Sequence, residues 1–159
     1  MKIDIICVGK LKENYFKDAV SEYLKRLSKY GNFNIIEVAD EKTPDKASEK
    51  EENIIKQKEG ERILKSVNDA SYVIALDLKG KELDSVELSL KISELGIKGI
   101  SHIQFIIGGS LGLSDEVIKR ADYSLCFSKM TFPHQLMRVI LLEQIYRSYR
   151  IINNEPYHK

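Results

Sequence analysis

Short apolar runs separated by longer amphipathic stretches make up most of this chain. The runs predict five buried strands, at residues 3–8, 34–38, 72–78, 103–107 and 123–127. Strands that are almost continuously apolar, without strict alternation, are typical of a parallel sheet covered on both faces. The pattern therefore indicates a sheet whose two sides are both buried.

Apolar residues that recur every three or four positions predict helices between these strands. The clearest helix ends near Leu27 and carries its charged residues on the opposite face. The heavily charged segment that follows residue 40 predicts a long solvent-exposed helix. Further helices are predicted from about Ser85 to Leu95 with Ser85 as the N-cap, after Ser114, and from about 134 to 151.

Two turn signals bound these helices. Thr43-Pro44 predicts the start of the charged helix, and Lys79-Gly80-Lys81 predicts a turn after the third strand. Strands that alternate with helices predict an α/β fold with a mostly parallel sheet flanked by helices. A length of 159 residues without linker or repeat favours one domain over residues 1–159.

The last predicted helix is apolar on more than one face. Its apolar residues are Leu136, Met137, Val139, Ile140, Leu141, Leu142, Ile145, Tyr146 and Tyr149. Such a helix either lies deep in a large core or packs against another subunit. Because this domain is small, we expect a homodimer formed through this helix.

The composition is that of a soluble globular protein. Hydrophobic residues make up 43% and charged residues 31% of the chain, and no apolar run reaches membrane-spanning length. The first residues lack the basic and apolar regions of a secretory signal. We therefore expect a cytoplasmic protein, and the net charge of +1 does not by itself indicate a nucleic-acid partner.

Neither the cysteines nor the histidines have the spacing of a metal site. Cys7 and Cys126 lie in separate apolar runs and are predicted to be buried thiols. His102, His134 and His158 are far apart in the sequence. No metal is therefore expected.

Three predicted strands end in residues suited to binding a ligand, since ligands of parallel sheets gather at the carboxyl ends of strands. These ends are Leu76-Asp77-Leu78, the glycine loop 108–112 and the segment 127–132. The loop does not fit G-x-G-x-x-G, because Ser110 and Leu113 stand where glycines are required, and no P-loop motif occurs. The residues alone predict a ligand-binding end, with a simple connecting turn as the alternative, and leave the reaction open.

Three motifs occur together in this chain: F-I-I-G-G-S-L-G at 105–112, L-C-F-S-K-M-T-F-P-H at 125–134 and N-E-P-Y-H-K at 154–159. In this order and length the chain resembles the RlmH-type ribosomal RNA methyltransferases of the SPOUT class. The resemblance covers essentially the whole chain, including C-V-G-K-L-K at 7–12. It is the combination of motifs that is specific.

The resemblance implies a C-terminal trefoil knot, a homodimer and S-adenosylmethionine as the methyl donor. The implied reaction methylates N3 of a pseudouridine in the large-subunit (23S) ribosomal RNA, on the assembled ribosome. Carried over residue by residue, the cofactor site falls on Leu76, Gly108, Phe127, Ser128, Lys129, Met130, Thr131 and Phe132.

The expected catalytic residues are His158, Tyr157 and Arg138, contributed by a facing subunit. Histidine ordinarily titrates near neutral pH, which suits His158 as the general base that removes the N3 proton. Arg138 is expected to stabilise charge on the uracil oxygens. Basic residues that could contact RNA phosphates are Lys129, Arg138, Arg147, Arg150 and Lys159.

Two alternatives remain open from the sequence. One is a non-catalytic ribosome-binding protein that keeps the fold as an RNA platform. The other is a SPOUT methyltransferase that acts on tRNA.

Overall fold

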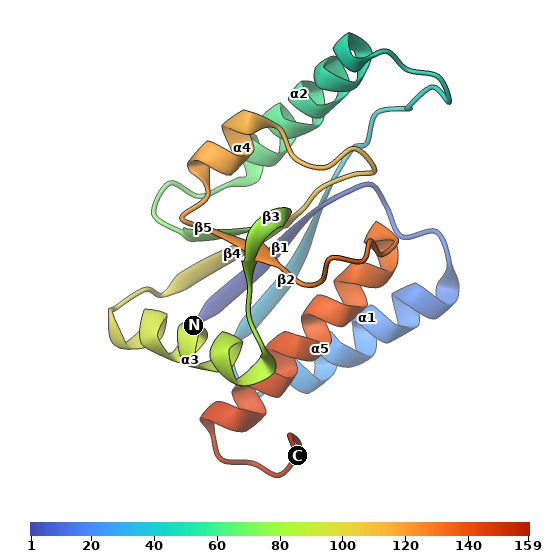
Figure 1. The fold of residues 1–159 in the computed structure, drawn as a ribbon. Helices are drawn as coiled ribbons and strands as arrows, with labels where there is room; N and C mark the ends of the chain where they lie inside the picture. The colour runs from blue at the N-terminus through green and yellow to red at the C-terminus, as the bar shows by residue number, and fades with distance from the viewer.

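Five parallel strands form one sheet in the order β2-β1-β4-β3-β5 (Figure 1). The computed structural model describes residues 1–159. The strands are β1 (Lys2–Val8), β2 (Asn32–Val38), β3 (Tyr72–Glu82), β4 (His102–Ile107) and β5 (Tyr123–Cys126). All four strand pairings are parallel, so the predicted α/β fold is confirmed and the sheet is wholly parallel.

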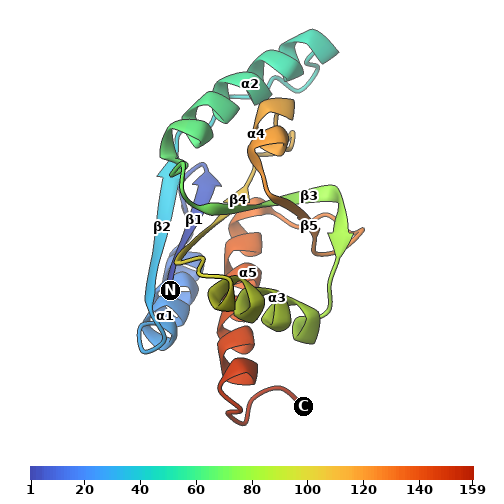
Figure 2. The ribbon, with the colours of Figure 1, turned by 90° about the vertical axis from the view of Figure 1, so that its left-hand side faces the viewer.

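Five helices cover the two faces of the sheet (Figures 1 and 2). They are α1 (Asn14–Leu27), α2 (Glu49–Ser66), α3 (Ser85–Ile97), α4 (Asp115–Arg120) and α5 (His134–Ile152). The larger core joins α1, α3 and α5 to one face, and a smaller core joins α2 and α4 to the other. Cys7 and Cys126 are buried free thiols, as predicted.

Helix α2 begins later than predicted. Its N-cap is Ser48, whose side chain accepts a hydrogen bond from the backbone N–H of Glu51 while the Glu51 carboxylate accepts from the Ser48 N–H. This reciprocal pair satisfies two donors that the first turn leaves free. The start predicted at Thr43-Pro44 is therefore wrong, because the local capping residues decide where the helix starts.

The turn predicted at Lys79-Gly80-Lys81 is also wrong, because β3 continues through it to Glu82. After an irregularity in the ladder, Lys81 pairs with Leu125 of β5. A Cβ on Gly80 would lie 2.7 Å from the backbone of Ser124. Glycine here allows β3 to approach β5 closely and continue as a strand.

Helix α3 is capped one residue earlier than predicted. Asp84, not Ser85, accepts the hydrogen bond from the Glu87 N–H, at 2.7 Å. The Glu87 carboxylate accepts from the Asp84 N–H in return. Predicted strand five is one residue shorter than expected and ends at Cys126.

Helix α5 is buried within its own chain to a greater extent than expected. Eight of its residues are buried and none is exposed, because α1, α3 and β4 surround it. Leu136, Val139 and Ile140 nevertheless stay partly exposed, so the homodimer through this helix stays a prediction. None of the five helices is long and apolar enough to cross a membrane.

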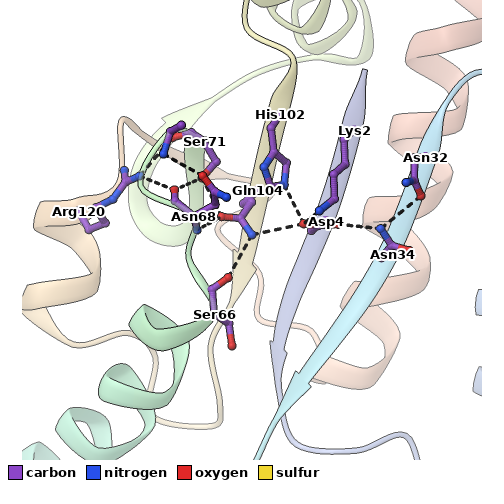
Figure 3. Close-up of polar contacts among 11 residues, drawn as sticks. Lys2, Asp4, Asn32, Asn34, Ser66, Asn68, Ser71, His102, Gln104 and Arg120 are labelled. Atoms are coloured by element: carbon purple, nitrogen blue, oxygen red, sulfur yellow. Dashed lines mark hydrogen bonds and ion pairs between the residues drawn. The ribbon is translucent and has the colours of Figure 1, made fainter.

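A polar network lies at the amino ends of β1 and β4, beyond the smaller core (Figure 3). The buried carboxylate of Asp4 contacts His102 Nε2 at 2.7 Å, accepts from Asn34 Nδ2 at 2.9 Å and pairs with Lys2 at 3.2 Å. Burial alone would raise the pKa of Asp4, but these partners together hold it below its ordinary value. Asp4 therefore favours the folded state when it is ionised.

We predict that Asp4→Asn lowers the free energy of unfolding by about 1–3 kcal/mol at neutral pH, because charge-assisted hydrogen bonds are lost. A carboxyl group with a lowered folded-state pKa stabilises above its unfolded pKa, and this stabilisation is lost as the pH falls through the folded value. The difference between the two proteins should therefore shrink below about pH 4. Urea unfolding at pH 7 and near pH 3 measures it.

The matched control is Asp18→Asn, on the exposed face of α1. It should change the free energy of unfolding by less than about 0.5 kcal/mol at either pH. An equal loss for Asp4→Asn at both pH values would contradict the role given to the ionised carboxylate.

Candidate active site

A cavity of about 480 Å³ opens beside the middle of β3 and the carboxyl ends of β4 and β5. Its volume lies within the range of roughly 300–1,000 Å³ that is common for small-molecule sites. Of the residues expected to hold the cofactor, those that line it are Leu76, Gly108, Phe127, Ser128, Met130, Thr131 and Phe132. Lys129 is exposed and is not part of the lining.

The glycine loop after β4 forms one wall of this cavity. It folds back on itself through a hydrogen bond of 3.1 Å from the Gly112 N–H to the Gly109 carbonyl, and Gly112 has a φ of +87°. A Cβ on Gly108 would lie 2.9 Å from Leu113 Cδ2 and 3.1 Å from the Gly112 carbonyl oxygen. The tight loop therefore requires glycine at these positions.

The segment after β5 forms the opposite wall. The Ser128 carbonyl accepts from the buried Cys126 thiol at 3.2 Å, and the Ser128 hydroxyl accepts from the Met130 N–H at 3.0 Å. The turn that results leaves Met130 76% and Phe132 37% exposed, and Leu78 across the cavity is 63% exposed. The mouth of the cavity thus has an apolar, uncovered rim.

Charged and polar groups from other elements also line the cavity, and of these only Asp77 was expected from the sequence. Among these groups are Lys56 of α2, Asp77 of β3 and His134 at the start of α5. Burial, followed by the charge of Arg138, lowers the pKa of His134 and so favours the neutral imidazole. His134 was visible in the S-K-M-T-F-P-H motif, whereas Lys56 had no signal in the sequence.

Arg138, expected to face the substrate base, is instead fully buried. Its guanidinium donates to Glu37 Oε2 at 2.7 Å and to the Gly9 carbonyl at 2.7 Å. It does not line the cavity. Its position fits a structural role at the end of β1, and the predicted contact with the base is not supported.

The C-terminal residues Tyr157 and His158 are held against the far end of α5. The Tyr157 hydroxyl donates to Glu143 at 3.1 Å, and its ring packs edge-on against Tyr146 at 5.0 Å. The exposed His158 places Nδ1 3.4 Å from Nη1 of Arg147. The C-terminal segment is therefore docked on its own helix.

The C terminus lies beyond the end of α5 (Figures 1 and 2), whereas the cavity is lined by a residue at the start of this helix. His134 lines the cavity, and Arg147 follows it by more than three helical turns, roughly 20 Å along the axis. Within one chain the structure thus brings the expected cofactor residues together but leaves Tyr157 and His158 far from them.

The whole length of this chain is similar to proteins of one known family. The model of the family described as "Predicted SPOUT methyltransferase" matches residues 1–158. The "Ribosomal RNA large subunit methyltransferase H" of Clostridium tetani is 67% identical to this chain, and the protein of that name in Clostridium acetobutylicum is 65% identical. Each match spans 100% of both chains.

Solved structures share the fold at low sequence identity. A methyltransferase of Legionella pneumophila, solved with the bound cofactor SAM, matches with a TM-score of 0.52 and 12% identity over 94% of this chain and 66% of that one. A tRNA methyltransferase of Aquifex aeolicus matches with a TM-score of 0.56 and 12% identity over 92% and 70%. Similarity at this level supports the fold alone.

We predict that Gly108→Ala weakens the binding of S-adenosylmethionine, the expected ligand of this cavity, by about tenfold. The added methyl group would collide with Leu113 and the Gly112 backbone, so the loop must shift. Titration calorimetry measures the affinity. Gly96→Ala is the control, because its Cβ would make only an ordinary contact of 3.5 Å with Met1. Equal affinity for Gly108→Ala and the parent would exclude this loop from the binding site.

Proposed function

Because this chain belongs to the SPOUT methyltransferase family, we propose that it methylates N3 of a pseudouridine in large-subunit ribosomal RNA. The observation that carries the proposal is full-length identity of 64–67% to proteins named as ribosomal RNA large subunit methyltransferase H. Membership of the family also implies the C-terminal trefoil knot. The site of action we propose is the cytoplasm, where the RNA is assembled into ribosomes.

The methyl donor is S-adenosylmethionine, which is bound in a structure of the same fold. The cavity fits such a molecule: backbone groups of the tight glycine loop adjoin it, and apolar side chains such as Leu76 and Phe127 can accept the face of an adenine. When bound, the sulfonium supplies an activated methyl group. We assign its binding to Leu76, Gly108 and the segment from Phe127 to Phe132.

The protein must hold the base in line with that methyl group and remove the N3 proton. We assign proton removal to His158 and contact with the base to Tyr157. An imidazole suits this step because histidine ordinarily titrates near neutral pH. No metal is required, since the sulfonium releases a neutral thioether, which is already a good leaving group.

A second copy of the chain would bring these groups to the cavity. His158 cannot reach the cavity of its own chain, because most of the length of α5 separates them. The exposed apolar rim formed by Leu78, Met130 and Phe132 gives a partner subunit a surface to cover. We therefore propose a homodimer in which each C-terminal segment completes the site of the other subunit.

The cations expected to contact RNA differ in their availability. Arg147 and Arg150 are paired with Glu143 and Glu155. Lys129 and Lys159 are exposed and form no ion pair. Lys129 lies beside residues that line the cavity, so we propose it as a phosphate contact near the reaction centre.

The proposed function predicts transfer of a labelled methyl group to ribosomes that lack the modification. We expect mass mapping to find one methylated pseudouridine in the large-subunit RNA, and no label on tRNA incubated separately. Label on tRNA alone would favour the tRNA enzyme. Ribosome binding without donor binding in calorimetry would favour the non-catalytic platform.

The shared site predicts complementation between two slow variants. Gly108→Ala weakens donor binding and His158→Ala removes the proposed base, so each homodimer should be slow when the donor concentration is kept below the dissociation constant of the parent. Subunits mixed, unfolded together and refolded should regain about a quarter of the parental activity, because random pairing restores one intact site in half of the dimers. If each site used only its own chain, mixing would restore nothing.

A further inference from the structure

Helix α2 contains an acid that is buried although most of the helix faces solvent. Glu59 is only 4% exposed, whereas the nearby residues Lys58 and Glu61 are exposed. Burying a carboxyl group is costly unless it has partners. The position of Glu59 therefore calls for a structural or functional reason.

Glu59 lies directly behind the glycine loop. A Cβ on Gly109 would be 2.9 Å from Glu59 Oε1 and 3.2 Å from Oε2, so the loop backbone rests against the carboxyl group. Gly108 and Gly109 line the donor cavity, whereas Glu59 does not. The carboxyl group thus touches the loop without being part of the cavity lining.

The same carboxyl group is fixed by the segment that follows β2. Its Oε2 accepts a hydrogen bond of 3.0 Å from the Glu41 N–H. Arg62, one turn further along α2, donates to the Ala39 carbonyl at 2.9 Å and to the Glu41 carboxylate. These contacts hold Glu59 from the side away from the cavity, so it cannot swing away from the loop freely.

The surroundings of Glu59 disfavour its charge. Burial raises the pKa of Glu59, and the nearby charges of Asp40 and Glu41 raise it further. The hydrogen bond from the Glu41 N–H and the charge of Arg62 lower it, but the net shift is upward. A carboxyl group in this position acts through its shape and its hydrogen bond more than through its charge. An amide of the same shape should replace it with little loss.

We propose that Glu59 is a positioning residue for the methyl donor: it supports the Gly108-Gly109 backbone from behind and so fixes the wall against which the donor binds. The inference rests on the proposed function, because it assumes that the cavity binds S-adenosylmethionine. Glu59 does not touch the donor itself, and the loop transmits its effect.

Calorimetry with S-adenosylmethionine tests the inference. Glu59→Ala should weaken donor binding by about tenfold, since the loop loses its support. Glu59→Gln keeps the shape and the acceptor oxygen, so it should bind within about twofold of the parent. The exposed neighbour Glu61 provides the control, and Glu61→Ala should bind like the parent. Parental affinity for Glu59→Ala would overturn the inference.

A double-mutant cycle separates positioning from a general loss of stability and does not depend on Glu59→Ala folding. Gly109→Ala alone should weaken donor binding, because the new methyl group meets the carboxyl group. Glu59→Asp draws the carboxyl group back by about one methylene and makes room for that methyl group. The double variant should therefore bind the donor at least about fivefold more tightly than expected from adding the two single changes in binding free energy.

Additive effects in this cycle would overturn the inference, and the thermal midpoints of all four proteins show whether each is folded. The outcome also distinguishes the two proposals. If the parent does not bind the donor, the proposed function fails and this inference fails with it. If the parent binds the donor and every variant binds equally, only the inference about Glu59 fails.

Discussion

The buried guanidinium of Arg138 joins three elements at the edge of the sheet where the cavity forms. It donates to the carbonyls of Val8 and Gly9, which end β1, and to the carboxylate of Glu37 in β2. That carboxylate also accepts from the Leu11 N–H. Removing Glu37 would leave the buried guanidinium without its carboxylate partner, so this contact ties the start of α5 to β1 and β2. His134, one turn earlier in α5, takes its place in the cavity as a consequence.

Close approaches of backbone to neighbouring groups determine the rest of the cavity. Gly60 lets α2 approach Ser114 of α4, because a Cβ there would lie 2.3 Å from the hydroxyl oxygen. Gly108 lets the loop after β4 close on itself, and Gly109 rests against Glu59. Each position excludes a side chain for a different reason. Together they fix the backbone of the loop that forms one wall of the cavity.

The elements of this fold could be predicted from the sequence because burial on two faces leaves a strong apolar pattern in each strand. Their ends could not, since local capping decides them: Ser48 and Asp84 cap their helices through residues three positions later. The Lys79-Gly80-Lys81 sequence is typical of a turn, and only the pairing of Lys81 with β5 shows that the strand continues. The three segments predicted to bind a ligand do meet at one cavity, although Leu76-Asp77-Leu78 lies within β3 and not at its end.

The roles of charged residues were harder to predict, because sequence does not show which way a long side chain points. Arg138 lies among apolar residues of α5 and looks like a cation available to RNA, yet its partners are backbone carbonyls of its own chain. The apolar pattern of α5 likewise does not show which of its residues a single chain will bury. One chain buries six of the apolar residues named for this helix, whereas Leu136, Val139 and Ile140 stay partly exposed. The proposed homodimer depends as well on the separation between the cavity and His158, which lie more than three helical turns apart along α5.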